Sequence, residues 1–160
     1  MIVAFTGHRP DLFADPPAAQ QAVATTLQAL LGEHPVQRLL LGGQRGVDTW
    51  AAQTATALAV PFTLLLPASP AEFTCEWAAP DRAVLAHLLS QAETVTVANG
   101  YTDRNRRLAT EANLLVAIWT GTTGGGTAET LAFAQAAGTP VRDVRLAPSA
   151  AAAQARGRGI

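Results

Sequence analysis

Lysine is absent from the sequence, so all eleven cationic side chains are arginines. A Walker A phosphate-binding loop and Schiff-base catalysis both need a lysine, so we expect neither. Arginine instead favours paired hydrogen bonds to phosphate or carboxylate groups. The single cysteine, Cys75, cannot form an internal disulfide. This favours a reducing compartment and predicts a cytoplasmic protein.

The sequence also has few aromatic residues, a net charge close to zero and no long apolar runs. Aromatic residues make up 6% of the chain and the formal net charge is −1, which argues against binding to nucleic acid or to an anionic membrane. No apolar run approaches the length that spans a bilayer, and no basic segment precedes the first apolar run as in a signal peptide. His8, His34 and His87 lack the spacing of metal ligands, so we expect no bound metal. We also expect no cofactor.

Apolar segments typical of strands alternate with segments of helical periodicity along the whole chain. This order predicts one α/β domain with a mostly parallel sheet of about six strands and helices on both faces. We expect the domain to span residues 1–146 and the Ala-rich residues 147–160 to form a flexible C-terminal tail. The expected strands are residues 2–5, 39–41, 61–67, 94–98, 114–119 and 141–146.

The most informative stretch follows the second expected strand, where three leucines lead into a glycine-rich turn and a helix. Glycine lets the backbone approach a ligand closely, and the first turn of a helix offers unpaired N–H groups and the positive end of the dipole. The pattern predicts a site for an anion such as phosphate, although a tight turn without a ligand has the same sequence. The residues concerned are Gly42, Gly43, Gln44, Arg45, Gly46 and Asp48.

Three further polar stretches also follow expected strands. The candidate site residues in them are Gly7, His8 and Arg9, then Tyr101, Arg104 and Asn105, and finally Gly124, Gly125, Gly126, Thr127 and Glu129. Arg104, Arg106 and Arg107 all fall near a helix start, where each cation costs about 0.3–1 kcal/mol unless an anion offsets it. This local conflict indicates either an anionic ligand or a solvated basic helix start.

The carboxyl ends of parallel strands share one edge of a sheet, and open α/β sheets bind ligands in the crevice beyond that edge. We therefore expect all four stretches to face one crevice that binds a nucleotide-sized, phosphate-bearing molecule. The dinucleotide fingerprint GxGxxG does not follow the first strand, so the sequence does not predict a redox enzyme that uses NAD.

Four motifs in order resemble the SLOG superfamily, and most of all its YpsA-like branch. They are TGHRP from Thr6, GGQRGVDTWAA from Gly42, YTDRN from Tyr101 and GGGTA from Gly124. The resemblance covers residues 1–146 and implies a Rossmann-like, doubly wound fold that binds an ADP-ribose-, NAD- or nucleoside-monophosphate-like ligand. Its relatives include sensors in stress or phage-defence signalling, lonely-guy phosphoribohydrolases that release a base from a nucleoside monophosphate, and DNA-processing proteins that bind single-stranded DNA.

The chain departs from the enzyme relatives at two motif positions. Arg104 matches their arginine, but Asn105 stands where they carry a lysine. Glu129 falls one position before their final glutamate, and Thr130 occupies that final position. If the protein is a nucleotide N-glycosidase, Glu129 and Asp48 are its candidate catalytic carboxylates.

Three functions remain open at this point. We favour the binding or sensing of a nucleotide-derived ligand, with a nucleotide N-glycosidase as the alternative. Single-stranded DNA binding is the second alternative, and we expect it least because the chain has few aromatic residues and no net positive charge. The sequence is compatible with several bases and numbers of phosphates in the ligand and with a homodimer.

Overall fold

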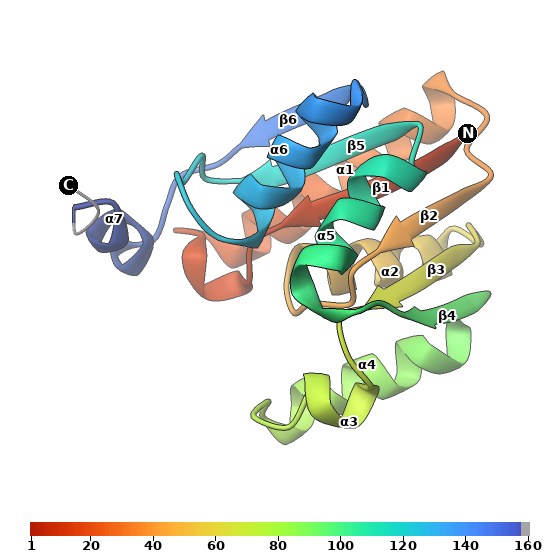
Figure 1. The fold of residues 1–160 in the computed structure, drawn as a ribbon, viewed down its shortest axis with the longest axis horizontal. Coiled ribbons are helices and arrows are strands. Elements are labelled where there is room, and N and C mark those ends of the chain that lie inside the picture. Colours follow the sequence, from red (N-terminus) through yellow and green to blue (C-terminus); the bar gives the residue numbers. More distant parts are fainter. Residues whose placement is uncertain (158–160) are drawn as a thin grey trace.

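The computed structural model describes residues 1–157 of the chain, without the side chains of residues 155–157 (Figure 1). The first half of the chain contains β1 (Ile2–Gly7), η1 (Pro10–Leu12), α1 (Pro16–Glu33), β2 (Arg38–Leu41), α2 (Val47–Ala57), β3 (Phe62–Leu66) and α3 (Pro70–Phe73). The second half contains α4 (Ala79–Gln91), β4 (Thr94–Val97), α5 (Gly100–Glu111), β5 (Leu114–Trp119), α6 (Gly126–Ala137), β6 (Val141–Arg145) and α7 (Ala150–Gly157).

The six strands form one sheet in the order β4-β3-β2-β1-β5-β6, and every neighbouring pair is parallel. β1 lies between β2 and β5, with Val3 opposite Leu39 on one side and Leu114 on the other. The chain thus winds outward from β1 to β4, crosses back, and continues through β5 to β6. The predicted α/β class, the parallel sheet and the six strands are confirmed.

Helices cover both faces of the sheet, and the alternation of side chains along the strands decides what each face contacts. Val3 and Phe5 of β1 belong to a core cluster with α1, α2 and α4, whereas Ala4 between them belongs to a second cluster with α5 and α6. In Figure 1, α5 and α6 lie in front of the sheet and α1 and α2 lie behind it. This doubly wound arrangement leaves the carboxyl edge of the strands to the connecting loops.

Several helix ends follow the capping signals in the sequence. The side chain of Asp15 accepts a hydrogen bond from Ala18 N at 3.1 Å, and a proline opens α1. Ser69 accepts a hydrogen bond from Glu72 N at 3.3 Å at the start of the short α3. Gly138 ends α6 in the left-handed conformation with φ of 72°. These three residues mark one end of the loops that adjoin them.

The segment after residue 146, for which we expected a flexible tail, leads into α7 and makes backbone hydrogen bonds to the segment after β1. Ala14 N donates a hydrogen bond to Ala147 O at 3.0 Å, and Ser149 N donates one to Leu12 O at 2.9 Å. Ser149 Oγ then accepts a hydrogen bond from Ala152 N at 3.2 Å, and the alanines that follow are strong helix formers. Helix α7 consequently lies beside the segment that follows β1 (Figure 1). Residues 158–160 of the expected tail lie outside the described residues.

Within the described part of the chain, none of the helices has the combination of length and apolar character that crossing a bilayer requires.

Candidate functional site

A cavity of about 580 Å³ opens at the carboxyl edge of the sheet, where β1 and β5 lie side by side. The chain leaves these two strands toward opposite halves of the sheet, so their loops separate and a crevice forms between them. All four polar stretches contribute to its lining. The predicted residues that line it are Gly7, His8, Arg9, Gln44, Asp48, Tyr101, Arg104, Asn105, Gly124, Gly125, Gly126 and Thr127.

The glycines of the β2–α2 loop lie behind the cavity wall and allow close packing there. A Cβ on Gly42 would stand 2.5 Å from Arg104 Nη1 and 2.9 Å from Asp48 Oδ2. Gly46 has φ of 91°, and a Cβ on it would stand 2.3 Å from the carbonyl oxygen of His8. Gly43, with φ of 77°, packs against Leu66. These three predicted residues therefore shape the site without lining the cavity.

Arg45 points away from the cavity, although it lies in the same loop. Its guanidinium lies 5.0 Å from the centre of the Trp77 ring, and its Nη1 lies 4.0 Å from Asp81 Oδ2. Trp77 is itself buried against Phe73, with ring centres 4.9 Å apart. Arg45 thus joins the β2–α2 loop to the α3–α4 segment, which is a structural contact.

Arg104 is a buried cation on the cavity wall, with only 6% of its surface exposed. Its Nη1 donates a hydrogen bond to Gly42 O at 2.6 Å, and its Nε donates one to Asn105 Oδ1 at 2.8 Å. The guanidinium also lies 5.5 Å from the centre of the Tyr101 ring. Burial lowers the pKa of Arg104, and the negative charge of Asp48 opposes that shift. The side chain is therefore held in one orientation before any ligand arrives.

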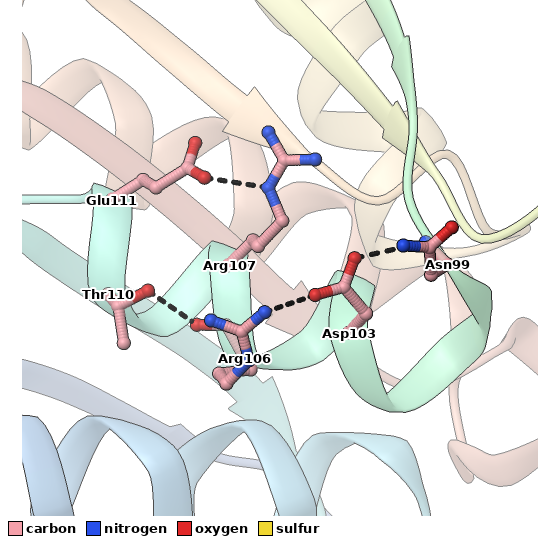
Figure 2. Close-up of polar contacts among 6 residues, drawn as sticks. All are labelled: Asn99, Asp103, Arg106, Arg107, Thr110 and Glu111. Carbon is pink, nitrogen blue, oxygen red and sulfur yellow. Dashed lines mark hydrogen bonds and ion pairs between the residues drawn. The ribbon is translucent and has the colours of Figure 1, made fainter.

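The two neighbouring arginines of α5 have local partners instead (Figure 2). Arg106 pairs with Asp103, and Arg107 Nε donates a hydrogen bond to Glu111 Oε1 at 2.7 Å. Asp103 also accepts a hydrogen bond from Asn99 N at 3.0 Å, and this bond is the main reason that its pKa is lowered. Nearby carboxylates thus offset the charges of Arg106 and Arg107, and Arg104 alone of the three lines the cavity.

Asp48 brings a carboxylate to the cavity wall and is 5% exposed. Its Oδ2 accepts a hydrogen bond from Gln44 N at 3.1 Å, whereas its buried Oδ1 has no hydrogen-bond partner among the described residues. Burial raises the pKa of Asp48 to about 6, against the opposing effects of the Arg104 cation and the Gln44 N–H. Asp48 is thus an acid whose charge changes close to neutral pH.

Glu129 lies outside the cavity lining and holds Asn105 in place. Asn105 Nδ2 donates a hydrogen bond to Glu129 Oε1 at 3.0 Å, and Thr102 Oγ1 donates one to Glu129 Oε2 at 3.5 Å. Since Asn105 Oδ1 accepts from Arg104, a chain of hydrogen bonds runs from Glu129 through Asn105 and Arg104 to Gly42. This chain ties α6, α5 and the β2–α2 loop together around the cavity.

His8 connects the loops that follow β1 and β5. Its Nε2 lies 3.1 Å from Thr120 Oγ1 and 3.4 Å from Thr122 Oγ1, and its ring packs near Phe13 and Trp119. The side chain is buried, so it holds the two loops at a fixed separation. Among the described residues, no group of three or more His, Cys, Asp or Glu side chains is placed to bind a metal ion.

Six lining residues were not among the predicted site residues: Thr6, Leu12, Leu108, Thr122, Thr123 and Ala152. Leu108 lies one helical turn after Arg104, so helical spacing provided a signal for it. Thr122 and Thr123 directly precede the predicted residues Gly124, Gly125 and Gly126. Leu12 and Ala152 carried no signal, because their place depends on how the C-terminal segment packs against η1.

Comparison with known proteins identifies the fold. No family model and no curated protein matches the chain. The X-ray structure of TM1055, a structural genomics target, is similar with a TM-score of 0.60 and 19% identity, over 88% of this chain and 71% of TM1055. DNA processing protein A (DprA) from Streptococcus pneumoniae is similar with a TM-score of 0.65 and 16% identity, over 96% of this chain and 60% of DprA. At these identities the likenesses show the fold alone, and this chain has the Rossmann-like α/β fold that the SLOG resemblance implies.

Proposed function

We propose that this chain binds a nucleotide-derived ligand of the ADP-ribose, NAD or nucleoside-monophosphate kind in the cavity at the carboxyl edge of the sheet. The observation that carries the proposal is Arg104, a buried cation that is already oriented on the wall of a cavity bordered by glycine-rich helix starts. Holding a charge in this position costs desolvation energy, which an anionic group of a ligand would offset.

The start of α6 supports a phosphate position within the cavity. Gly124, Gly125 and Gly126 line it, and α6 begins at Gly126. Because glycine has no side chain to cap a helix, the first N–H groups of α6 are available to an anion, and the helix dipole adds to their attraction. Arg104 and this helix start would together hold one phosphate group.

The size and lining of the cavity support a ligand larger than phosphate. Its volume of about 580 Å³ lies within the range of about 300–1,000 Å³ that is common for small-molecule sites. Leu12 and Leu108 supply apolar surface, and the ring of Tyr101 adds an aromatic one. A nucleotide combines a charged phosphate with a flat aromatic base, and so matches this combination.

The direct test is a thermal-shift panel of AMP, ADP-ribose, NAD and free phosphate with the purified protein. A ligand at a hundred times its dissociation constant adds about 2.7 kcal/mol to the free energy of unfolding. At this chain length we expect a rise of roughly 2–4 °C in melting temperature for each kcal/mol. A panel without any shift at millimolar concentration would contradict the proposal.

A nucleotide N-glycosidase is the second candidate, and Asp48 is the observation that favours it. A buried carboxyl group with a pKa of about 6, in a cavity that also holds Arg104, has the character of a catalytic acid or base. Glu129 is the weaker candidate because both of its oxygens accept hydrogen bonds from protein side chains. Chromatography of the base released from nucleoside monophosphates separates an enzyme from a binding protein.

Single-stranded DNA binding is the third candidate, and only the structural likeness to DprA favours it. That likeness concerns the fold at 16% identity, and this chain spans 60% of the length of DprA. A groove for single-stranded DNA relies on basic and aromatic side chains, whereas this chain has a formal net charge of −1. Affinity for an oligonucleotide that falls steeply with salt would favour this candidate over the first two.

A further inference from the structure

Asp48 lines the cavity, and one of its two carboxylate oxygens has no hydrogen-bond partner among the described residues. The side chain is 95% buried and is held by a hydrogen bond from Gln44 N to Oδ2. Oδ1 is also buried, and it has no hydrogen-bond partner among the described residues. Buried carboxylate oxygens are normally paired, since an unpaired one keeps the full cost of its desolvation. A ligand that donates a hydrogen bond to Asp48 would remove this cost.

Asp48 lies beside the position that attracts an anion. Arg104 Nη1 and Asp48 Oδ2 both lie within 3.0 Å of the point at which a Cβ on Gly42 would stand, so these two cavity-lining residues have their charged groups close together beside Gly42. A phosphate at Arg104 would be repelled by the carboxylate, and Asp48 would need a neutral donor next to that phosphate. In a nucleotide the group bonded directly to the phosphate is the sugar, and its hydroxyls are neutral donors.

We propose that Asp48 accepts a hydrogen bond from a hydroxyl of the ligand's sugar, so that the cavity selects ribonucleotides over deoxyribonucleotides. This inference rests on the proposed nucleotide-binding function. An exocyclic amine of the base is the other neutral donor in a nucleotide, but the base lies one ring farther from the phosphate. The ring of Tyr101, which is 53% exposed at the cavity, offers the base a stacking surface there.

Calorimetry with four nucleotides of similar size and charge tests the inference. AMP carries both ribose hydroxyls, 2′-deoxy-AMP and 3′-deoxy-AMP each lack one, and purine riboside 5′-monophosphate lacks the amine of the base. A hydrogen bond to a charged acceptor is among the stronger kinds, so we expect the parent protein to bind AMP at least tenfold more tightly than one of the two deoxy analogues. Purine riboside 5′-monophosphate should bind within about threefold of AMP.

Asp48→Asn supplies the matched variant. Its single amide oxygen can still accept the hydrogen bond from Gln44 N, which turns the amide NH₂ toward the position of Oδ1. The variant then presents a donor where the parent presents an acceptor. The difference between AMP and the deoxy analogues should shrink to about threefold or less. Glu111→Gln, which removes one carboxylate on the outer side of α5, should keep the preference of the parent.

Each outcome bears on one of the two proposals. If the parent protein binds none of the four nucleotides and also neither ADP-ribose nor NAD, the proposed function fails, and this inference fails with it. If AMP and both deoxy analogues bind within threefold of one another, the sugar contact is wrong while nucleotide binding stands. If affinity instead drops for purine riboside 5′-monophosphate, the donor is the base amine and the assignment to the sugar is overturned.

Discussion

Two carboxylates stand in the first turns of helices that follow glycine-rich loops, Asp48 in α2 and Glu129 in α6. Both positions suit a negative charge, because the helix dipole stabilises an anion there. Their surroundings differ. Asp48 is almost fully buried on the cavity wall with one oxygen unpaired, whereas Glu129 is partly exposed, lies outside the lining and contacts two side chains of α5.

The difference shows that a carboxylate's position in a helix does not decide its chemistry. At Asp48 burial raises the pKa to about 6, although the nearby Arg104 cation acts to lower it. At Glu129 hydrogen bonds from Asn105 and Thr102 occupy both carboxylate oxygens. We therefore expect Asp48 to act on a ligand directly and Glu129 to act through Asn105 on the orientation of Arg104.

The largest expected effect is the pH dependence of stability that Asp48 produces. Its pKa in the folded protein, about 6, is raised above the ordinary value of 3.8, so folding takes up a proton between these two values. The contribution to the free energy of unfolding is fully present below pH 3.8 and is lost as the pH rises through about 6. A shift of about two pKa units corresponds to about 3 kcal/mol.

Urea unfolding of the parent and of Asp48→Asn at pH 4.5 and pH 7.5 measures this effect. The neutral amide of asparagine does not ionise. The free energy of unfolding of the variant, relative to that of the parent, should therefore be about 1–3 kcal/mol higher at pH 7.5 than at pH 4.5. Glu129→Gln is the control for the loss of one carboxylate near the start of a helix. An equal pH dependence in Asp48→Asn and the parent would contradict the buried, raised acid.

Arg104→Ala should have the next largest effect, which is on the affinity for a nucleotide. A charge-assisted hydrogen bond to phosphate contributes about 1.5–3 kcal/mol, so nucleotide affinity should fall at least tenfold in calorimetry. Arg106→Ala is the matched control, since Arg106 lies two positions away on the same helix and pairs with Asp103 (Figure 2). Equal losses in the two variants would indicate general attraction by the basic helix start and would move Arg104 out of the site.

Local signals in the sequence predicted much of this framework. The runs of apolar residues predicted the strands, and residue types that commonly cap helices, Asp15, Ser69 and Gly138, stand at helix ends in the structure. Parallel strands place their carboxyl ends at one edge, so the convergence of four loops followed from topology alone. These features depend on neighbours in sequence or on the order of elements, and a sequence records both.

Features that depend on packing between distant segments were not predictable in this way. Arg45 and Asp48 are only three positions apart in the sequence, yet Arg45 lies over Trp77 while Asp48 lines the cavity. Ala152 reaches the cavity only because the backbone of residues 147–149 bonds to the segment after β1. The different surroundings of Asp48 and Glu129 likewise arise from contacts among α2, α5 and α6. The spacing of residues in the sequence does not indicate such contacts.

The smallest expected effect comes from Glu129→Gln, and it decides between a binding protein and an enzyme. The amide oxygen of glutamine can still accept the hydrogen bond from Asn105, so Arg104 should keep its orientation. Losing the charge and one acceptor should cost about 0.5–1.5 kcal/mol, which is a change of less than about tenfold in nucleotide affinity. We expect no base release by the parent protein, and therefore an effect on binding only.

If the protein is instead a glycosidase that uses Glu129 at the sugar, base release by the parent should fall about a hundredfold or more in Glu129→Gln while the nucleotide still binds. A glycosidase that uses Asp48 gives the opposite pattern, because base release would persist in Glu129→Gln and vanish in Asp48→Asn. Chromatography of the base released from AMP by the three proteins separates these outcomes. Turnover by the parent in either pattern would contradict the binding function, and the variant that abolishes it would identify the catalytic carboxylate.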